Sequence, residues 1–546
     1  MNRKAYLSIL LAVIFMAFAF LTGCSSSTAT PPATGTTYVF YLTGLENINE
    51  GPNFYTAAGA VTLDAAGDVT GGEEDYNDGF GLTDAPTPIA AATGALAVDP
   101  TTGQGTLTLT VGDTNLGVGG VETLGVQFVN TNHALIIQFD GSATSSGSLD
   151  LQTATEASGN FAFTYSGVNV DYDPSASGGV VTVASGLING VYDFNDADLG
   201  VEYDQTLTQG TVSTVDAFGR GTISGTQLAG SLAYYVVGPE VVRFICDDTD
   251  AALIGSAYGQ GSSTFTAANI GSSVFDIQAN AWGEFQTTVG SFTTDGVSVV
   301  TGGIADSAEG GDDFIGESIS GTYTVSNDAV NGYSNLIITS ENLGDVSNLG
   351  VYMTDPALNL LDPNNTTTGL GGALVLDLDT PLPGSTGVLM PQTDTTSTDF
   401  TGNYAFGGQL FNGDDFWEVD FVGQGSVATG VLAGTGIVSD IGGFYSSSPT
   451  DTAVGFAATP LADENESTTG RYTIFDENES GPLVITIGES EFGADTVLYQ
   501  ASGGYLFWMQ EDDFANFLGP VEQQGSLTGL PAVRKAMAKS PQAKKR

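Results

Sequence analysis

Clustered carboxylates are the residues of this chain best suited to bind an ion. They follow a recurring hairpin at Glu73, Glu74, Asp75 and Asp78, at Asp193, Asp196 and Asp198, and at Asp306, Glu309, Asp312 and Asp313. Carboxylate oxygens on a loop are hard ligands suited to Ca²⁺. None of the three clusters has EF-hand spacing, however, and the fourth copy keeps only Asp440. The alternative is a solvated acidic loop that prevents strand edges from pairing with other molecules.

We therefore expect no metal or other cofactor. The alternative is that the acidic clusters bind calcium. The candidate calcium ligands are Glu73, Glu74, Asp75, Asp78, Asp193, Asp196 and Asp198.

The only histidine, His133, falls in a predicted turn where the other copies carry residues such as Glu240, Pro356 and Gly503. A catalytic Ser-His-Asp or Cys-His arrangement therefore cannot be a feature that all four repeats share. Zinc needs clustered His and Cys, and a Walker-type phosphate loop needs a lysine that the body lacks. We expect His133 to be an exposed turn residue. The sequence predicts no catalytic residue and no enzymatic activity.

These residues are positioned by a unit that occurs four times. Its hairpin begins at Gly59, Gly178, Gly290 and Gly423, and it reads as a strand, a small-residue turn, a second strand and a polar or acidic loop. Spacings above one hundred residues are too long for a propeller blade or a solenoid coil.

Strands with one buried face fill each unit. In residues 106–111, Leu107, Leu109 and Val111 alternate with threonines, which is the period of two that a sheet requires. About eight such strands follow one another without a helix, so neighbours must be antiparallel. Short turns and frequent glycines favour an up-and-down barrel of lipocalin-like or avidin-like shape. A two-sheet sandwich is the alternative.

The predicted organisation runs from a leader to a basic tail. It comprises a signal peptide (1–23), a flexible tether (24–36), β repeats at 37–153, 158–268 and 270–380, a Pro/Thr/Ser linker (381–399), a fourth β repeat (400–530) and a disordered tail (531–546).

The leader indicates export. Arg3 and Lys4 precede an apolar run that ends in Leu21-Thr22-Gly23-Cys24. This ending resembles the lipobox of bacterial lipoproteins, which implies cleavage before Cys24 and a diacylglycerol on its thiol. Ser25 follows, and by that family's rule this favours the outer membrane. The alternative is an uncleaved single-pass anchor. Beyond this segment the chain resembles exported proteins built of glycine-rich β repeats.

Charge excludes one class of partner. The net charge is −52, and between Lys4 and Arg534 the only cations are Arg220, Arg243 and Arg471. A body this acidic repels nucleic acid. Six of the eleven basic residues lie in the tail, which could dock on an acidic barrel face or on anionic envelope polymers. Cys246, alone in a strand-like segment, is expected to be a buried thiol.

Three functions remain open. The first is a non-catalytic envelope lipoprotein whose repeats are structural or adhesion-like modules, with an envelope protein or polysaccharide as partner. The second is binding of small apolar or saccharide ligands in the barrels, with Tyr38, Phe40, Phe128 and Phe139 facing inward. The third, least favoured, is a carboxylate hydrolase. The oligomeric state stays open.

Overall fold

A computed structural model describes most of the repeat region. The described residues are 35–46, 53–79, 86–112, 117–226, 228, 230–249, 251–279, 286–309, 312–325, 331–340, 348–365, 371–379, 384–395, 400–412, 417–428, 431–441, 450–458, 469–474, 483–487, 490–494, 496–510 and 516–531. The predicted signal peptide, the predicted lipidation site Cys24 and residues 532–546 of the predicted basic tail lie outside these residues.

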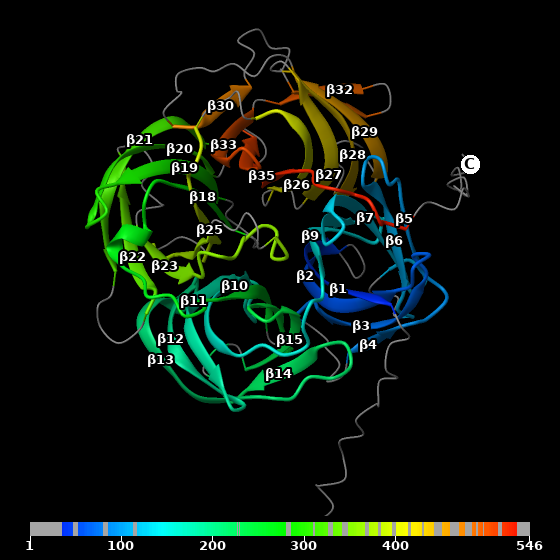
Figure 1. Cartoon of the computed structure of the whole chain (residues 1–546), viewed down its shortest axis with the longest axis horizontal. Coiled ribbons are helices and arrows are strands. Elements are labelled where there is room, and N and C mark those ends of the chain that lie inside the picture. The colour runs from blue at the N-terminus through cyan, green and yellow to red at the C-terminus, as the bar shows by residue number, and fades with distance from the viewer. Residues whose placement is uncertain are drawn as a thin grey trace, which may run out of the picture. The chain divides into compact units, whose positions relative to one another are not determined.

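The described elements are almost all strands (Figure 1). The first repeat holds β1 (Thr36–Glu46), β2 (Asn53–Leu63), β3 (Val69–Asn77), β4 (Thr87–Ile89), β5 (Ala95–Val98), β6 (Gln104–Thr110), β7 (Val121–Asn130), β8 (His133–Gln138) and β9 (Ala143–Leu151). The second holds β10 (Gly159–Val168), β11 (Pro174–Ala184), β12 (Leu187–Asp196), β13 (Gly200–Val212), β14 (Arg220–Ser224), β15 (Ser231–Gly238), β16 (Val241–Cys246) and β17 (Ala252–Gly259).

The second half of the chain repeats this pattern. A single 3₁₀ turn, η1 (Ala267–Asn269), leads into the third repeat. That repeat holds β18 (Ser273–Gln278), β19 (Gln286–Thr294), β20 (Val299–Glu309), β21 (Asp312–Val325), β22 (Tyr333–Thr339), β23 (Asn348–Thr354), β24 (Gly372–Asp377) and β25 (Thr386–Pro391). The fourth holds β26 (Gly402–Asn412), β27 (Trp417–Ala428), β28 (Val431–Ile441), β29 (Thr450–Ala458), β30 (Arg471–Ile474), β31 (Leu483–Ile487), β32 (Ser490–Ala494), β33 (Thr496–Ser502), β34 (Tyr505–Gln510) and β35 (Asn516–Gln523). Across the described residues, no helix is long and apolar enough to cross a membrane.

The prediction of tandem antiparallel barrels is confirmed. Strands β10–β17 and β18–β25 each form a closed eight-stranded barrel. The first repeat is a nine-stranded sheet with β4 and β5 at its edges, and an isolated bridge connects Asp68, just before β3, to Ala95 in β5. The fourth is a ten-stranded sheet. Successive strands pair antiparallel throughout the two closed barrels, as expected where no crossover helix intervenes.

Side-chain alternation places the cores inside the barrels. In β6 the predicted inward residues Leu107 and Leu109 are fully buried, and the threonines between them are half-buried. By contrast, β1 is buried on both faces from Val39 to Glu46, except at Tyr41. Its outer face is therefore covered by other repeats, which is what creates a site there.

One predicted boundary is wrong. The segment predicted as a linker, residues 381–399, contains β25, the strand that closes the third barrel by pairing with β18 and β24. The third repeat therefore continues past residue 380. Proline and threonine content misled the prediction, since both residues fit a short strand at the end of a ladder. The expectation for Cys246 is confirmed, because its thiol is fully buried in the core of the second barrel.

A glutamine after the last strand joins each repeat to its neighbour. Gln152 donates its side-chain amide to the carbonyls of Phe218 and Val236 in the second repeat, at 2.7 and 2.9 Å. The same double contact is made by Gln260 to Asn331 and Met353, by Gln392 to Thr469 and Gln500, and by Gln524 to Thr102 and Phe128. The last of these returns from the fourth repeat to the first.

A buried aspartate makes a second recurring contact. The Oδ atoms of Asp75 in β3 accept the Nε and Nη2 hydrogens of Arg220, at 2.6 and 2.7 Å, and the Tyr235 hydroxyl at 2.6 Å. Asp193 in β12 accepts the hydroxyls of Tyr333 and Tyr352. Asp306 in β20 accepts Arg471 and Tyr499 in the same way as Asp75. The strand pairing places the three aspartates at equivalent positions of their repeats. The equivalent residue of the fourth repeat is Ile437.

Candidate functional site

Corresponding positions in the four repeats can be identified from a phenylalanine on the first strand. Each of these phenylalanines pairs with a glycine on the second strand: Phe40 with Gly59, Phe163 with Gly179, Phe275 with Gly290, and Phe406 with Gly423. Glycine is needed in the first and third repeats because a Cβ there would lie 2.6 Å from the phenylalanine ring. The phenylalanines point into the barrels, so the residues one and three positions later point outward.

These outward positions line a cavity of about 230 Å³. They are Tyr41 and Thr43 in the first repeat, Asp276 and Gln278 in the third, and Gly407 and Gln409 in the fourth. The second repeat contributes Arg243 from β16. All four repeats therefore supply side chains or backbone to one polar space.

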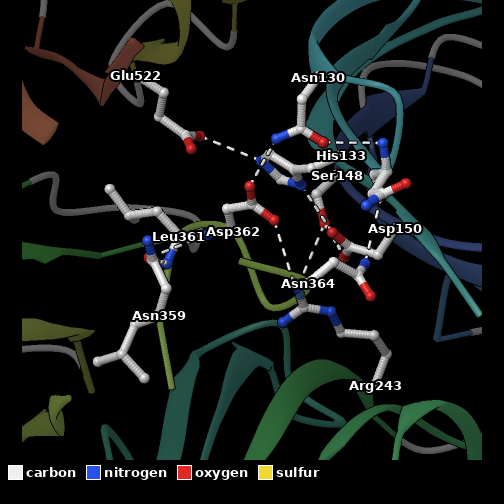
Figure 2. Close-up of polar contacts among 12 residues, drawn as sticks. Asn130, His133, Ser148, Asp150, Arg243, Asn359, Leu361, Asp362, Asn364 and Glu522 are labelled. Carbon is white, nitrogen blue, oxygen red and sulfur yellow. Dashed lines mark hydrogen bonds and ion pairs between the residues drawn. The ribbon is translucent and has the colours of Figure 1, made fainter. Parts of the chain in front are cut away.

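His133 lies at the wall of this cavity, at the start of β8. Its Nδ1 is 2.7 Å from Asp150 Oδ1, and its Nε2 is 3.1 Å from Glu522 Oε1 (Figure 2). All three side chains are buried. The expectation of an exposed turn residue is therefore wrong, because the fourth repeat covers the outer face of β8. Strands β26–β28 pack on this face, and Glu522 of β35 contacts His133.

The two carboxylates control the protonation of this histidine. Burial alone would lower the pKa of His133, but Glu522 and Asp150 outweigh it and raise the pKa well above its ordinary value. Burial raises the pKa of Glu522, and the neighbouring His133 offsets part of that shift. The ring therefore acts as a cation between two acids.

Arg243 continues the network into the second repeat. Its Nη2 is 2.8 Å from Asp150 Oδ2, and its Nη1 donates to Ser256 Oγ and to the Tyr258 hydroxyl at 2.6 and 2.9 Å. The guanidinium carbon lies 4.5 Å from the centre of the Tyr41 ring, a cation–π contact. Burial would raise the pKa of Asp150, but Arg243 and His133 lower it to about 2.

A loop of the third repeat, residues 358–365, also reaches this site. The Asp362 carboxylate accepts the Asn130 amide at 2.7 Å, and Asn364 donates to the Asn132 carbonyl at 3.3 Å. The Tyr258 hydroxyl donates to the Leu360 carbonyl at 2.8 Å. Figure 2 shows Asp362 and Asn364 from this loop beside His133 and Arg243.

Three polar atoms at the cavity have no hydrogen-bond partner among the described residues. They are Arg243 Nε, Glu522 Oε2 and Thr43 Oγ1. All three side chains are more than nine-tenths buried. A buried polar atom without a partner is costly, so a solvent molecule or a ligand must satisfy these atoms.

The acidic residues singled out from the sequence lie elsewhere. Glu73, Glu74 and Asp75 belong to strand β3 and are buried, so the prediction of an acidic loop is wrong there. Glu74 lies against Glu122 inside the first barrel, where burial and Glu74 raise the pKa of Glu122 well above its usual range. Burial and Asp216 raise the pKa of Glu73 to about 9. Strand residues were mistaken for a loop because three acids in a row break the apolar alternation.

The other candidate ligands are already bound to protein groups or are exposed. Asp193 is buried at a contact between repeats, and Asp196 Oδ1 accepts the amides of Asp198 and Leu199. Asp78 is half-buried and Asp198 is exposed. Within the described ranges no group of three or more His, Cys, Asp or Glu is placed to hold a metal ion. Calcium binding stays a prediction.

Sequence reasoning missed Asp150, Arg243, Asp276 and Glu522 as site residues. Asp150 and Glu522 each stand two residues before a junction glutamine, at Gln152 and Gln524. That recurring glutamine, followed each time by Thr or Gly, was the available signal. Phe139, predicted to face inward, instead packs against the apolar cluster of Leu135, Val422 and Ile437 between the first and fourth repeats.

Comparison with known proteins adds no family. No family model and no curated protein sequence matches this chain. Solved structures give weak likenesses to a CymD monoaromatic hydrocarbon channel (7% identity, 90% of this chain and 87% of that one, TM-score 0.10) and to the Pseudomonas putida toluene transporter TodX (7%, 92% of each, TM-score 0.08). Likenesses this weak carry no argument about function.

Proposed function

We propose that this protein is a non-catalytic, lipid-anchored protein of the cell envelope whose four β repeats act together as one interaction body. The observation that carries the proposal is the junction-glutamine contact, which is made four times and includes Gln524 to Thr102 and Phe128. Repeats acting as independent spacers would need no contact between the last and the first.

Further contacts between the fourth and first repeats support a single body. The Leu45 amide donates to Glu418 Oε2 at 2.5 Å, and the Gln409 side chain donates to the Thr43 carbonyl at 3.0 Å. The hydroxyls of Thr144 and Ser439 also meet. Partner groups on different repeats would therefore meet a surface of fixed spacing, which favours recognition of an extended envelope protein or polysaccharide.

The barrel interiors argue against storage of an apolar ligand. Tyr38, Phe40 and Phe128 fill the first core. The second barrel encloses a cavity of about 60 Å³ between apolar residues such as Phe163 and Phe244. By comparison, an apolar cavity that binds benzene has a volume of about 150 Å³. The described interiors are thus filled mainly by their own side chains, as in many small barrels.

Anchoring rests on the Leu21-Thr22-Gly23-Cys24 ending of the leader. One lipidated cysteine carrying more than one acyl chain gives stable membrane attachment. The net charge of −52 keeps the body away from anionic surfaces, so attachment would come from the lipid and not from the protein surface. The outer membrane is the proposed site.

The anchor is tested with Cys24→Ser in the native host. We expect the wild type in the outer-membrane fraction with its leader removed. The variant should instead be either an uncleaved precursor held in the inner membrane by its apolar leader, or a soluble protein. A processed variant recovered in the outer membrane at the wild-type level would contradict lipid anchoring.

Joint action of the repeats is tested with Gln524→Leu in the full chain. We expect weaker co-sedimentation with envelope fragments from the host, with circular dichroism unchanged. Gln205 is half-buried and donates its side-chain amide to the nearby Tyr203 carbonyl within its own repeat, so Gln205→Leu is the matched control. Equal co-sedimentation of all three proteins would contradict action as one body.

A further inference from the structure

The cavity lined by Tyr41, Thr43, Arg243, Asp276 and Glu522 is polar and holds unsatisfied groups. We propose that it binds a neutral, polyhydroxylated molecule of about the size of a monosaccharide. The inference is independent of lipid anchoring and of the envelope partner, because it concerns only the interior of the described body.

Size sets the first limit. The cavity of about 230 Å³ exceeds the roughly 150 Å³ that accommodates benzene and lies below the volume of most drug-sized ligand pockets. A single pyranose ring with its substituents falls in this interval, whereas a disaccharide or a lipid chain does not. Filled by water alone, it would hold about eight molecules at roughly 30 Å³ each.

Charge sets the second limit. Arg243 and His133 place two cations at the wall, and Asp150 and Glu522 place two acids beside them. Asp276 adds a carboxyl whose pKa burial raises to about 7. A ligand with a net charge of either sign would meet a like charge in a space with little water, at a cost of several kcal/mol. A neutral ligand avoids that cost.

Hydrogen-bonding capacity identifies the ligand's chemistry. Arg243 Nε is a free donor, Glu522 Oε2 a free acceptor, and Thr43 Oγ1 can be either. A hydroxyl group both donates and accepts, so neighbouring hydroxyls on a ring can satisfy a donor and an acceptor together. An apolar ligand would leave all three buried atoms unpaired and would bind poorly.

The corresponding positions of the second repeat show the alternative arrangement. Ser166 occupies the position of Thr43, and its hydroxyl lies 3.1 Å from Thr386 Oγ1 of the third repeat. There the two repeats satisfy each other's side chains. Only at the cavity does the same first-strand position, Thr43, present an unpaired hydroxyl.

The first test measures binding of three probes, D-glucose, D-galactose and N-acetyl-D-glucosamine, to the purified full-length protein. We expect saturable binding of at least one probe at millimolar concentration by calorimetry. Thr43→Val should weaken that binding by about tenfold, the effect of one lost hydrogen bond. Its fold should be unaffected, because the Thr43 hydroxyl bonds no described protein group.

A matched variant separates ligand binding from packing. Thr496 is also a buried strand threonine whose hydroxyl has no described partner, and neither it nor its strand partners Ile474 and Gln510 line the cavity. Thr496→Val should leave the affinity unchanged, and Asp276→Asn should alter it. Equal effects of Thr43→Val and Thr496→Val would overturn the assignment of the cavity.

Two other results would overturn the proposal. One is saturable binding of inorganic phosphate at the cavity in place of the sugars, which would mean a charged ligand. The other is no saturable binding of any of the three sugars, which would mean that the cavity holds only water.

Discussion

Arg471 donates two parallel hydrogen bonds to Asp306, although the two residues belong to different repeats. The distances are 2.6 Å from Nε to Oδ2 and 2.5 Å from Nη2 to Oδ1. Both are buried. Arg220 binds Asp75 in the same way two repeat interfaces earlier. Between these two interfaces, Tyr333 holds Asp193 from the corresponding position. The chain itself therefore shows which residue can replace the arginine.

Arg471→Leu should destabilise the protein by about 3–5 kcal/mol, because it leaves the Asp306 carboxylate buried without its ion-pair partner. Arg471→Tyr should cost clearly less, since a tyrosine hydroxyl performs this role at Tyr333. Urea denaturation of the full-length variants measures both. Equal losses for the two variants would show that the contact depends on charge and not on hydrogen bonding.

Gln524→Leu should loosen the contact between the fourth and first repeats. The variant loses two hydrogen bonds to carbonyls of the first repeat, worth about 1–2 kcal/mol together because Gln127 still donates to the Thr102 carbonyl. Hydrogen exchange should accelerate at the Gly525 amide, which donates to the Val129 carbonyl. Gln260→Leu is the matched control, and it should leave exchange at Gly525 unchanged. Global acceleration in both variants would contradict a local contact.

The barrels were predictable because their signal is local. Leu107 and Leu109 alternate with threonines, and this alternation alone identifies a strand with one buried face. The site was not predictable in this way. His133 meets Glu522 across 389 residues of sequence, and Asp150 meets Arg243 across 93. Period-two alternation describes which residues face a barrel interior, but not which outer faces the neighbouring repeats cover.

Asp276 should make stability fall as pH rises. Burial raises its pKa to about 7 from an unfolded value near 3.8, so between these values the native state binds a proton that the unfolded state has released. Asp276→Asn should remove this slope. We expect a change of about 1–3 kcal/mol across the window, reduced from the full value because the cavity's contents screen the charge.

Asp295 provides a control of opposite sign. Backbone amides of Val299, Ser298 and Val297 lower the pKa of this carboxyl. The stability that this carboxylate contributes is present above its unfolded pKa and is lost as pH falls through its folded pKa. Asp295→Asn should therefore make stability depend less on pH in the acidic range, in the direction opposite to Asp276→Asn. Urea midpoints measured across the acidic to neutral range test both variants, and slopes of the same sign would refute the assignment.

His133 should stay protonated in the native protein above pH 6.5, its ordinary pKa, because Glu522 and Asp150 outweigh the effect of burial. Its stabilising effect is fully present below the unfolded pKa and is lost as pH rises through the folded value. Since this is the only histidine, its ring signals in an NMR titration need no assignment. A titration midpoint at or below 6.5 would contradict the buried charge network.

His133→Gln gives a second measure of the same network. The neutral amide cannot replace the imidazolium between two acids, so the variant should lose several kcal/mol below pH 6.5. The loss should shrink at alkaline pH, where wild-type His133 is also neutral. A loss that does not vary with pH would indicate packing and not charge.

The acidic runs show why composition was a poor guide to the candidate site. The charge of Glu73, Glu74 and Asp75 led to their assignment to a loop, yet strand β3 continues through them. Their burial is possible because Asp75 pairs with Arg220 and Glu74 lies against Glu122. Whether an acid can be buried depends on a partner elsewhere in the chain. The sequence did indicate that some acids are buried. The body has only three cations, and a buried carboxylate needs a partner such as an arginine.

All three arginines of the body are used in contacts between repeats: Arg220 with Asp75, Arg243 with Asp150 and Arg471 with Asp306. These are also the only trypsin cleavage positions between Lys4 and Arg534. The folded body should therefore resist trypsin as long as the repeats stay together, and cleavage at any of the three would report that an interface has opened. Complete digestion would leave residues 5–220 and 244–471 as two very long fragments, so a routine tryptic survey would detect the body of this protein chiefly through the 23-residue fragment 221–243.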